Sequence, residues 1–276
     1  MAAHLRASFA DLYGGVASLN VWQYNNSYYE AGPEVPRVPV RFHDCQNKGY
    51  TPSGWNTIFG SVPVPNGAVP AVGRDAALSV YSPGTDQLWE FWRMERRTDG
   101  WYACWGGRID DASTSDGIFE GNWGSTATGL ANSAGMVRIA DIRAGRIDHA
   151  VNVAIPAPAH WKTFSWPAQR SDGFSTDPHA MPEGIRFRLD PKLDVAALDL
   201  HPVAEMIAVA GQRHGFIVTD KAGTLAVTTE SGAAEKARTG TDPWVGLLAG
   251  TPSYAVLANF PWEHVQVLPM HYGRPQ

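Results

Sequence analysis

Short runs in which apolar and polar residues alternate recur along most of the chain. They are RVPVRF (37–42), AALSVY (76–81), QLWEFWRM (87–94), GWYACW (100–105), MVRIADI (136–142), HAVNVAI (149–155), GIRFRL (184–189), FIVTD (216–220) and TLAVTT (224–229). A period of two predicts half-buried strands, and many short strands between turn signals are typical of a sandwich or barrel. The pattern therefore predicts a mainly β protein, an antiparallel β-sandwich of jelly-roll type, with a hairpin across TDKAG (219–223).

A helical period occurs in HPVAEMIAVAGQRHG (201–215), where Pro202 suits the first turn and Gly215 suits the position after the last. The apolar residues that share one face are Val203, Met206, Ile207 and Ala210. We therefore expect one docked helix near 202–214. A shorter helix is predicted in DPWVGLLAG, with Asp242 as its N-cap and Pro243 at its first position.

The first 35 residues lack a clear period and are rich in asparagine and tyrosine, as in NVWQYNNSYYEAGPEVP. This composition predicts a peripheral N-terminal arm at 1–35 that docks to neighbouring proteins, followed by a single β-sandwich domain at 36–276. The opening MAAHLRASFADLYGG has no uninterrupted apolar run and does not match a signal peptide.

Four tryptophans lie between residues 86 and 111, at positions 89, 92, 101 and 105. A two-residue turn at Asp99-Gly100 would place Met94 opposite Trp105 and Trp92 opposite Gly107. This register predicts that Trp92 and Trp105 are core residues. Trp101 and Trp89 lie nearer the strand ends and are predicted as ligand-binding residues at the rim of a glycan groove, with a place in the core as the alternative. A different loop length would change the register and the faces.

Composition narrows the function classes. The net charge of −5 gives no electrostatic footprint for nucleic acid or an anionic membrane, and no apolar stretch is long enough to span a bilayer. The two cysteines, Cys45 and Cys104, have no CxxC partner; two buried thiols are the favoured interpretation and a disulfide the alternative.

Three polar clusters carry candidate chemistry, each with a purely structural alternative. RFHDC places His43 beside Asp44, and RIDHAV places Asp148 and His149 at the start of an apolar strand, where an imidazole beside a carboxylate can act as a general base. SWPAQRSDG suits sugar hydroxyls through the side chains of Trp166, Gln169, Arg170 and Asp172. Glu90 and Glu183 are carboxylates set among apolar residues, and glycoside hydrolysis usually requires two carboxylates close in space.

Metal and cofactor motifs are not found. DDASTSDGIFEGN has the look of a calcium loop, but Asp116 and Asn122 stand where an EF-hand requires glycine and glutamate. The histidines have no zinc spacing, and there is no phosphate-binding, dinucleotide-binding or nucleophile-elbow motif. We expect neither a metal nor a cofactor.

Several long motifs resemble a family of uncharacterised, usually exported actinobacterial proteins. They are RVPVRFHDCQNKGY, LWEFWRMERRTDGWYACWGGRID, GSTATGLANSAGMVRIADIRAGRIDHAVNVAIP, FSWPAQRSDG and PEGIRFRLDPKLD, within residues 37–268. A chain of this kind without a leader is also similar to minor tail proteins of phages that infect these bacteria. The resemblance implies a virion tail protein that contacts cell-envelope polysaccharide and, through its arm, other tail proteins. The alternatives are a secreted polysaccharide hydrolase or lyase, with His149, Asp148, Glu90 and Glu183 as candidate catalytic residues, and a purely structural tail decoration protein.

Overall fold

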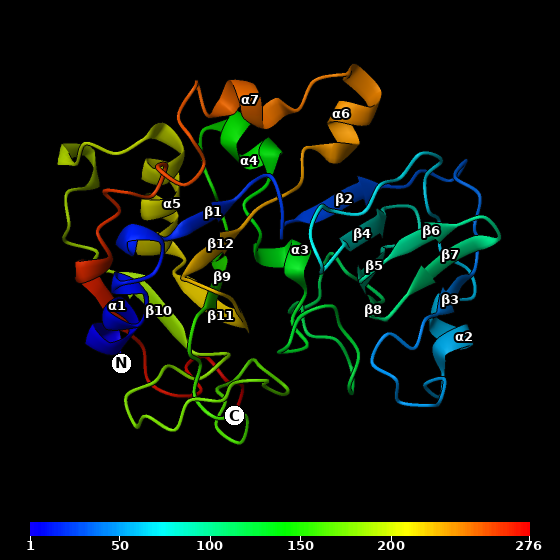
Figure 1. The fold of residues 1–276 in the computed structure, drawn as a ribbon, viewed down its shortest axis with the longest axis horizontal. Coiled ribbons are helices and arrows are strands. Elements are labelled where there is room, and N and C mark those ends of the chain that lie inside the picture. The colour runs from blue at the N-terminus through cyan, green and yellow to red at the C-terminus, as the bar shows by residue number, and fades with distance from the viewer.

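A computed structural model describes residues 1–276 and contains three mixed β-sheets (Figure 1). The largest has the order β1-β12-β9-β11-β10-β13. Its strands are β1 (Ser18–Asn20), β9 (Val151–Ile155), β10 (Arg186–Leu189), β11 (Phe216–Lys221), β12 (Ala226–Thr228) and β13 (Val265–Val267). Two of its five pairings, β1 with β12 and β9 with β11, are parallel.

The other two sheets lie together on the right of Figure 1. One has the order β2-β4-β5-β8, formed by β2 (Asn26–Glu30), β4 (Ala77–Ser82), β5 (Gln87–Trp92) and β8 (Trp105–Ile109). The third has the order β3-β7-β6, formed by β3 (Val40–Phe42), β7 (Gly100–Ala103) and β6 (Glu95–Arg97). Each contains one parallel pair, β2 with β4 and β3 with β7. The β-rich fold is confirmed, but the sheets are mixed where an antiparallel sandwich was expected.

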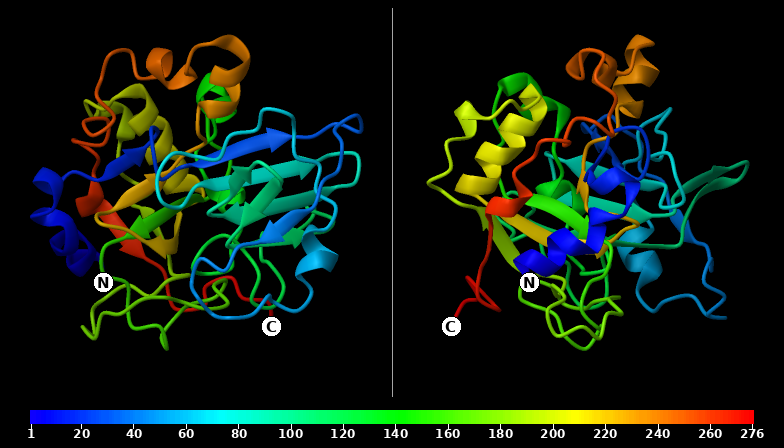
Figure 2. Two further views of the ribbon diagram at one scale, coloured as in Figure 1. Left: turned by 45° about the vertical axis from the view of Figure 1, so that its right-hand side comes forward. Right: turned by 60° about the vertical axis from the view of Figure 1, so that its left-hand side comes forward.

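Most helices lie over the large sheet or along the upper edge of the molecule, and one short helix packs against β3 and β8 of the smaller sheets (Figure 1, Figure 2). They are α1 (Ala2–Ala10), α2 (Trp55–Phe59), α3 (Asn132–Gly135), α4 (Ile139–Ala144), α5 (Pro202–Arg213), α6 (Ala233–Thr239) and α7 (Pro243–Leu247), with 3-10 turns η1 (Tyr13–Gly15), η2 (Val195–Ala197) and η3 (Trp262–His264). A core of 33 buried residues surrounds the large sheet, and a separate core of 14 lies between the two smaller ones.

Both predicted helices are confirmed. Helix α5 begins with Pro202 at its first position and is followed by Gly215 with φ of 77°, a left-handed conformation that glycine adopts without strain. Helix α7 begins at Pro243, and the Asp242 carboxylate accepts a hydrogen bond of 3.1 Å from the Trp244 N–H.

Two local predictions are wrong. MVRIADI contributes helix α4 instead of a strand, because Asp141 accepts the Arg138 N–H at 2.9 Å at the helix start and left-handed Gly145 ends it. These capping signals outweigh the apparent alternation. The expected hairpin across TDKAG does not form either, since β9 lies between β11 and β12 and pairs with both.

The N-terminal segment is part of the body of the protein. Leu5 and Phe9 of α1 are buried in the large core, where the Phe9 ring meets Trp262 edge-on at 6.5 Å. Strands β1 and β2 then pair with β12 and β4, so this segment adds a strand to two different sheets. Each of these pairings joins residues far apart in sequence, which explains why no local pattern revealed them. The expected peripheral arm is corrected accordingly.

The tryptophan hairpin has a different register from the predicted one. Its turn lies at Thr98-Asp99, and Trp92 pairs with Trp105. Arg93 has a φ of 53° and interrupts the strand between β5 and β6, although the pairing keeps the same register on both sides. The side chains that enter the 14-residue core are Trp89 and Phe91 before the interruption and Met94 after it, so the alternation changes phase there.

The interruption at Arg93 exchanges the expected roles of the four rings. Trp89 is 1% exposed and Trp101 is 7% exposed, and both belong to the 14-residue core. Trp92 and Trp105, predicted as core, are only partly buried. Met94 is buried as expected.

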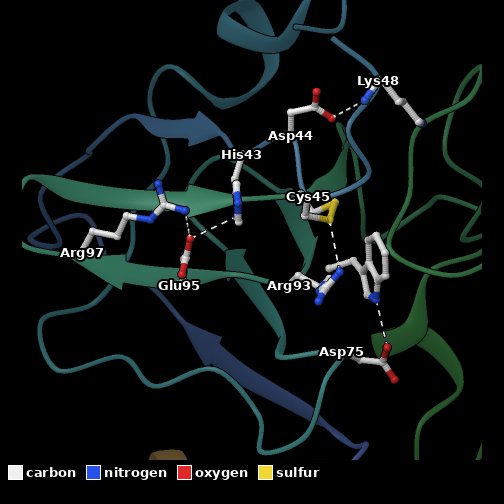
Figure 3. Close-up of a disulfide and its surroundings, with 10 residues drawn as sticks. His43, Asp44, Cys45, Lys48, Asp75, Arg93, Glu95 and Arg97 are labelled. Carbon is white, nitrogen blue, oxygen red and sulfur yellow. Dashed lines mark hydrogen bonds and ion pairs between the residues drawn. A yellow bond between two sulfur atoms is a disulfide. The ribbon is translucent and has the colours of Figure 1, made fainter. Parts of the chain in front are cut away.

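Cys45 and Cys104 form a disulfide, which corrects the favoured interpretation of two free thiols (Figure 3). The bond ties the loop after β3 to the residue between β7 and β8. Arg93 donates a hydrogen bond of 3.4 Å to the Cys45 sulfur, which links the interruption between β5 and β6 to the disulfide.

Candidate functional site

Trp101 lines two adjoining hollows beside the β6–β7 hairpin. The larger has a volume of about 330 Å³ and the smaller about 130 Å³, and both share Val38, Arg96 and Trp101. We call this surface the Trp101 groove; its other lining residues are Pro36, Pro39, Arg41, Val64, Pro65, Asn66, Gly67, Thr98, Asp99 and Gly100. The larger volume lies at the lower end of the range of ligand sites, ~300–1,000 Å³.

Charged side chains stand around the ring. The Arg96 guanidinium lies over Trp101 at 5.5 Å from the ring centroid, so it covers much of the indole face. Arg41 donates to the Asp99 carboxylate at 2.8 Å, and the Tyr102 hydroxyl donates to the same oxygen at 2.8 Å. The hydrogen bond from Tyr102 is the main reason why the pKa of Asp99 lies below its ordinary value. The groove therefore combines the exposed part of one indole with fixed donors and an ionised acceptor.

A second candidate site is a cluster of three carboxylates, Asp172, Glu183 and Asp220, which we call the acidic cluster. One oxygen from each lies within 4.8 Å of the others. Glu183 is completely buried, Asp220 is partly buried and Asp172 is exposed. The Asp172 N–H donates to Glu183 Oε2 at 3.1 Å, whereas Glu183 Oε1 has no hydrogen-bond partner.

The backbone fixes each member of the acidic cluster. The register of β11 against β9 shifts between Val218 and Asp220, which turns Asp220 toward the loop that carries Asp172. Gly184 follows Glu183 with a φ of 81°, and a Cβ there would collide with the Ser165 carbonyl oxygen. Only glycine fits at this close approach of two backbone segments.

Burial and mutual repulsion act on these carboxyl groups. Burial, followed by the nearby charges of Asp172 and Asp220, raises the pKa of Glu183 to about 8. Burial and the charge of Asp172 raise the pKa of Asp220 to about 7. Lys221 forms an ion pair of 2.5 Å with Asp172, on the solvent side of the cluster.

Exposed aromatic rings lie on the same long loop between β9 and β10. Trp161 is 53% exposed and Phe174 is 59% exposed. The Trp161 N–H donates to the Gly173 carbonyl at 2.8 Å, so the two backbone segments run side by side. This surface is the second of the candidate sites that offers an aromatic ring, after the Trp101 groove.

Asp148 and His149 do not form a catalytic pair. Asp148 is exposed and forms an ion pair of 2.6 Å with Arg146. His149 lies 3.2 Å from Asp141 and 2.9 Å from the Ala150 carbonyl. Burial lowers the pKa of His149, but these two hydrogen bonds outweigh it and the net shift is upward.

Glu90 has a structural role. Its carboxylate accepts hydrogen bonds from the Ser125 hydroxyl (2.6 Å), the Asn132 N–H (2.9 Å) and both the N–H (2.8 Å) and hydroxyl (2.6 Å) of Ser133. All of its acceptor capacity is used to hold the start of α3 against β5, and nothing brings it into the acidic cluster.

His43 and Asp44 are also occupied by local contacts (Figure 3). His43 lies 3.2 Å from Glu95, and Asp44 accepts the backbone N–H groups of Lys48 (2.8 Å) and Gly49 (2.7 Å). These backbone hydrogen bonds lower the pKa of Asp44. His43 and Asp44 therefore have the structural role that was the alternative to a general base.

In the SWPAQRSDG segment, Arg170 has a structural role and Asp172 belongs to the acidic cluster. Arg170 donates to the carbonyls of Asn122 (2.6 Å), Trp123 (3.1 Å) and Thr126 (3.0 Å), so it ties two loops together. Trp166 is half-buried beneath the Arg186 guanidinium, at 5.4 Å. The Gln169 side chain is exposed.

The sequence analysis missed Asp220, Arg96 and Asn66. Asp220 ends the apolar run FIVTD, and a charged residue at that position was the signal that could have marked it. Its partners lie far away along the chain, so proximity was not visible. Arg96 and Asn66 occupy turn-rich segments whose approach depends on the hairpin register.

No helix has the length and apolar character to cross a membrane. No protein-family model, curated protein or solved structure matches this chain.

Proposed function

We propose that this protein binds a cell-envelope polysaccharide through the Trp101 groove. The observation that carries the proposal is that Trp101 and Arg96 line both hollows, with Arg41 and Asp99 beside them in the larger one. Sugar rings present apolar C–H faces to aromatic and guanidinium planes and hydroxyl groups to fixed donors and acceptors. Sites that combine an apolar floor with a few placed polar groups are typical of small-molecule recognition.

Access to the ring defines the expected pose. Because Arg96 lies over Trp101, a sugar packs against the guanidinium and the edge of the indole, and Arg41 and Asp99 meet its hydroxyl groups. Arg96 is exposed, so its removal leaves the core intact while it removes one wall of the groove.

The test is affinity electrophoresis in gels that contain actinobacterial arabinogalactan. Arg96→Ala is expected to weaken the retardation at least about tenfold, which corresponds to roughly 1.4 kcal/mol. Arg213→Ala, an exposed arginine of α5, is the matched control and is expected to bind as the unaltered protein does.

Trp161→Ala separates the Trp101 groove from the aromatic loop. If Trp161→Ala abolishes binding and Arg96→Ala does not, the polysaccharide binds at the loop and the proposed site is wrong. If the unaltered protein is not retarded by the polysaccharide, the binding function itself is contradicted, and a purely structural tail decoration role gains support.

Two settings follow from the resemblance, a phage tail and secretion by an actinobacterium. The Cys45–Cys104 disulfide supports the exported setting, because disulfides persist in oxidising compartments and are rare in a reducing cytosol. In the tail setting, contact with other virion proteins is proposed to use exposed side chains such as Tyr13, which is 78% exposed. Detection of the chain in purified virions or in culture supernatant decides between the two settings.

Polysaccharide hydrolysis is a second candidate function, favoured by one observation. Glu183 lies beside two other carboxylates, and burial raises its pKa to about 8, as is typical of a general acid in a glycosidase. Its complete burial opposes this role, since the carboxyl group does not reach the surface. Release of reducing ends that Glu183→Gln abolishes would establish hydrolysis.

A further inference from the structure

We propose that the acidic cluster of Asp172, Glu183 and Asp220 is a binding site for a divalent cation of the Ca²⁺ type. The spacing of the three carboxylate oxygens fits such an ion. Two oxygen ligands on opposite sides of a Ca²⁺ ion are separated by about 4.8 Å, twice a typical Ca²⁺–oxygen distance of ~2.4 Å. The three carboxylate oxygens lie within 4.8 Å of one another, so one ion can reach all three.

One carboxylate oxygen of Glu183 is buried without a hydrogen-bond partner. This residue is 0% exposed, and Oε1 has neither a hydrogen-bond donor nor access to solvent. A buried polar atom without a partner is costly, and its presence in a folded protein calls for a specific explanation. The carboxylate that carries this atom faces two further carboxylates, which is the environment that a cation requires.

The cations of the protein do not fill this role. Lys221 bonds to Asp172, through both its carboxylate (2.5 Å) and its carbonyl (3.2 Å), at the exposed side. Arg170 directs its hydrogen bonds to three backbone carbonyls, and its charge interacts with Asp220 and Glu183 only through space. Glu183 and Asp220 therefore have no cationic hydrogen-bond partner, and their combined charge of −2 when ionised matches one divalent ion.

Oxygen-only donors favour Ca²⁺ over softer metals, and the mixture of buried and exposed ligands favours it over Mg²⁺. Ca²⁺ accepts irregular coordination by six to eight oxygens, whereas Mg²⁺ requires near-octahedral geometry at shorter distances of ~2.1 Å. The exposed side at Asp172 leaves positions for water. The site also differs from the DDASTSDGIFEGN segment, whose spacing fails for calcium.

Ca²⁺ at this site would join two positions of the loop between β9 and β10 to strand β11. Asp172 belongs to the loop that carries Trp161 and Phe174, Glu183 ends that loop, and Asp220 lies in β11 of the large sheet. We therefore expect the ion to stabilise the loop against the sheet, independently of polysaccharide binding in the Trp101 groove.

The test uses the full chain stripped of metal with a chelator and then dialysed against radioactive Ca²⁺. We expect one Ca²⁺ per chain and a rise in melting temperature with Ca²⁺ concentration, because a ligand that binds only the folded state stabilises it. Glu183→Gln and Asp220→Asn are each expected to weaken Ca²⁺ binding at least about tenfold, since affinity depends on the number of charged ligands. Asp111→Asn, an exposed residue of the DDASTSDGIFEGN segment, is the matched control and should leave Ca²⁺ binding unchanged.

Stability in chelator separates loss of the site from loss of the fold. Without Ca²⁺, Glu183→Gln should melt at the same temperature as the unaltered protein or higher, because the variant removes a buried acidic group. The proposal is overturned if the unaltered protein binds no Ca²⁺ up to about 5 mM, a concentration above the usual dissociation constants of extracellular calcium modules. It is also overturned if both variants bind as well as the unaltered protein, or if Mg²⁺ produces an equal stabilisation at equal concentration.

Discussion

The two tryptophans of strand β5 provide a matched comparison of core and surface. Trp89 is 1% exposed, packs in the 14-residue core and donates its indole N–H to the Ile58 carbonyl at 3.2 Å. Trp92, three residues later, is partly exposed and donates to the Asp75 carboxylate at 3.0 Å. The same substitution in the same strand thus tests the two environments directly.

The structure predicts different costs for the two alanine substitutions. Trp89→Ala should lower the free energy of unfolding by about 3–5 kcal/mol, the usual range for a buried large aromatic residue. Trp92→Ala removes one exposed hydrogen bond, worth about 1 kcal/mol, and the contact with the Arg93 guanidinium at 5.4 Å, worth about 0.5–1 kcal/mol. The expected difference between the two variants is therefore about 1–3.5 kcal/mol.

Urea unfolding followed by far-ultraviolet circular dichroism measures both variants, since this signal does not depend on the indole fluorescence that the substitutions alter. A uniform hairpin without the interruption at Arg93 would give the opposite order, with Trp92 as the core residue. If Trp92→Ala destabilises the protein as much as Trp89→Ala or more, the interruption at Arg93 and the observed burial of the two rings are wrong.

Three further predictions concern the fold and the acidic cluster. Phe9→Ala should lower the free energy of unfolding in urea by about 3–5 kcal/mol, whereas Arg6→Ala, at an exposed position, should not lower it measurably. If the two variants unfold at the same urea concentration, the N-terminal segment is a peripheral arm after all. Cys45 and Cys104 are 59 residues apart in sequence, so reduction of their disulfide should lower the free energy of unfolding by about 4 kcal/mol through loop-closure entropy. An unfolding curve that reductant does not change would refute this. In chelator the folded state binds the Glu183 proton more tightly than the unfolded state, so the free energy of unfolding should fall as the pH rises from about 4.5 to about 8. Glu183→Gln should make this fall with pH less steep, and an equally steep fall would contradict the raised pKa.

Local signals predicted the elements that depend on local physics. Strands such as β4, β5, β9 and β11 follow from alternation over a few residues, and α5 and α7 follow from proline at the first helical turn and residues suited to capping. Alternation does not show which strands pair with each other. The parallel pairings of β1 with β12 and of β2 with β4 join distant residues, so they could not be read from the sequence.

The candidate site was less predictable, for two physical reasons. A single residue in a left-handed conformation, Arg93, changed which tryptophans face the core, and arginine carries no local signal for that conformation. The acidic cluster combines residues from a loop, a loop end and a strand. Glu183 was identified from its apolar surroundings, but the role of Asp220 depends on the register shift in β11.

Hydrogen–deuterium exchange with and without arabinogalactan oligosaccharide tests the proposed binding function most directly, because it locates the bound sugar on the unaltered protein. Amides in the segments that line the Trp101 groove, 36–41, 64–67 and 96–101, are predicted to exchange more slowly when the oligosaccharide is bound. Protection confined to residues 160–175, or no protection anywhere at saturating oligosaccharide, would contradict the account.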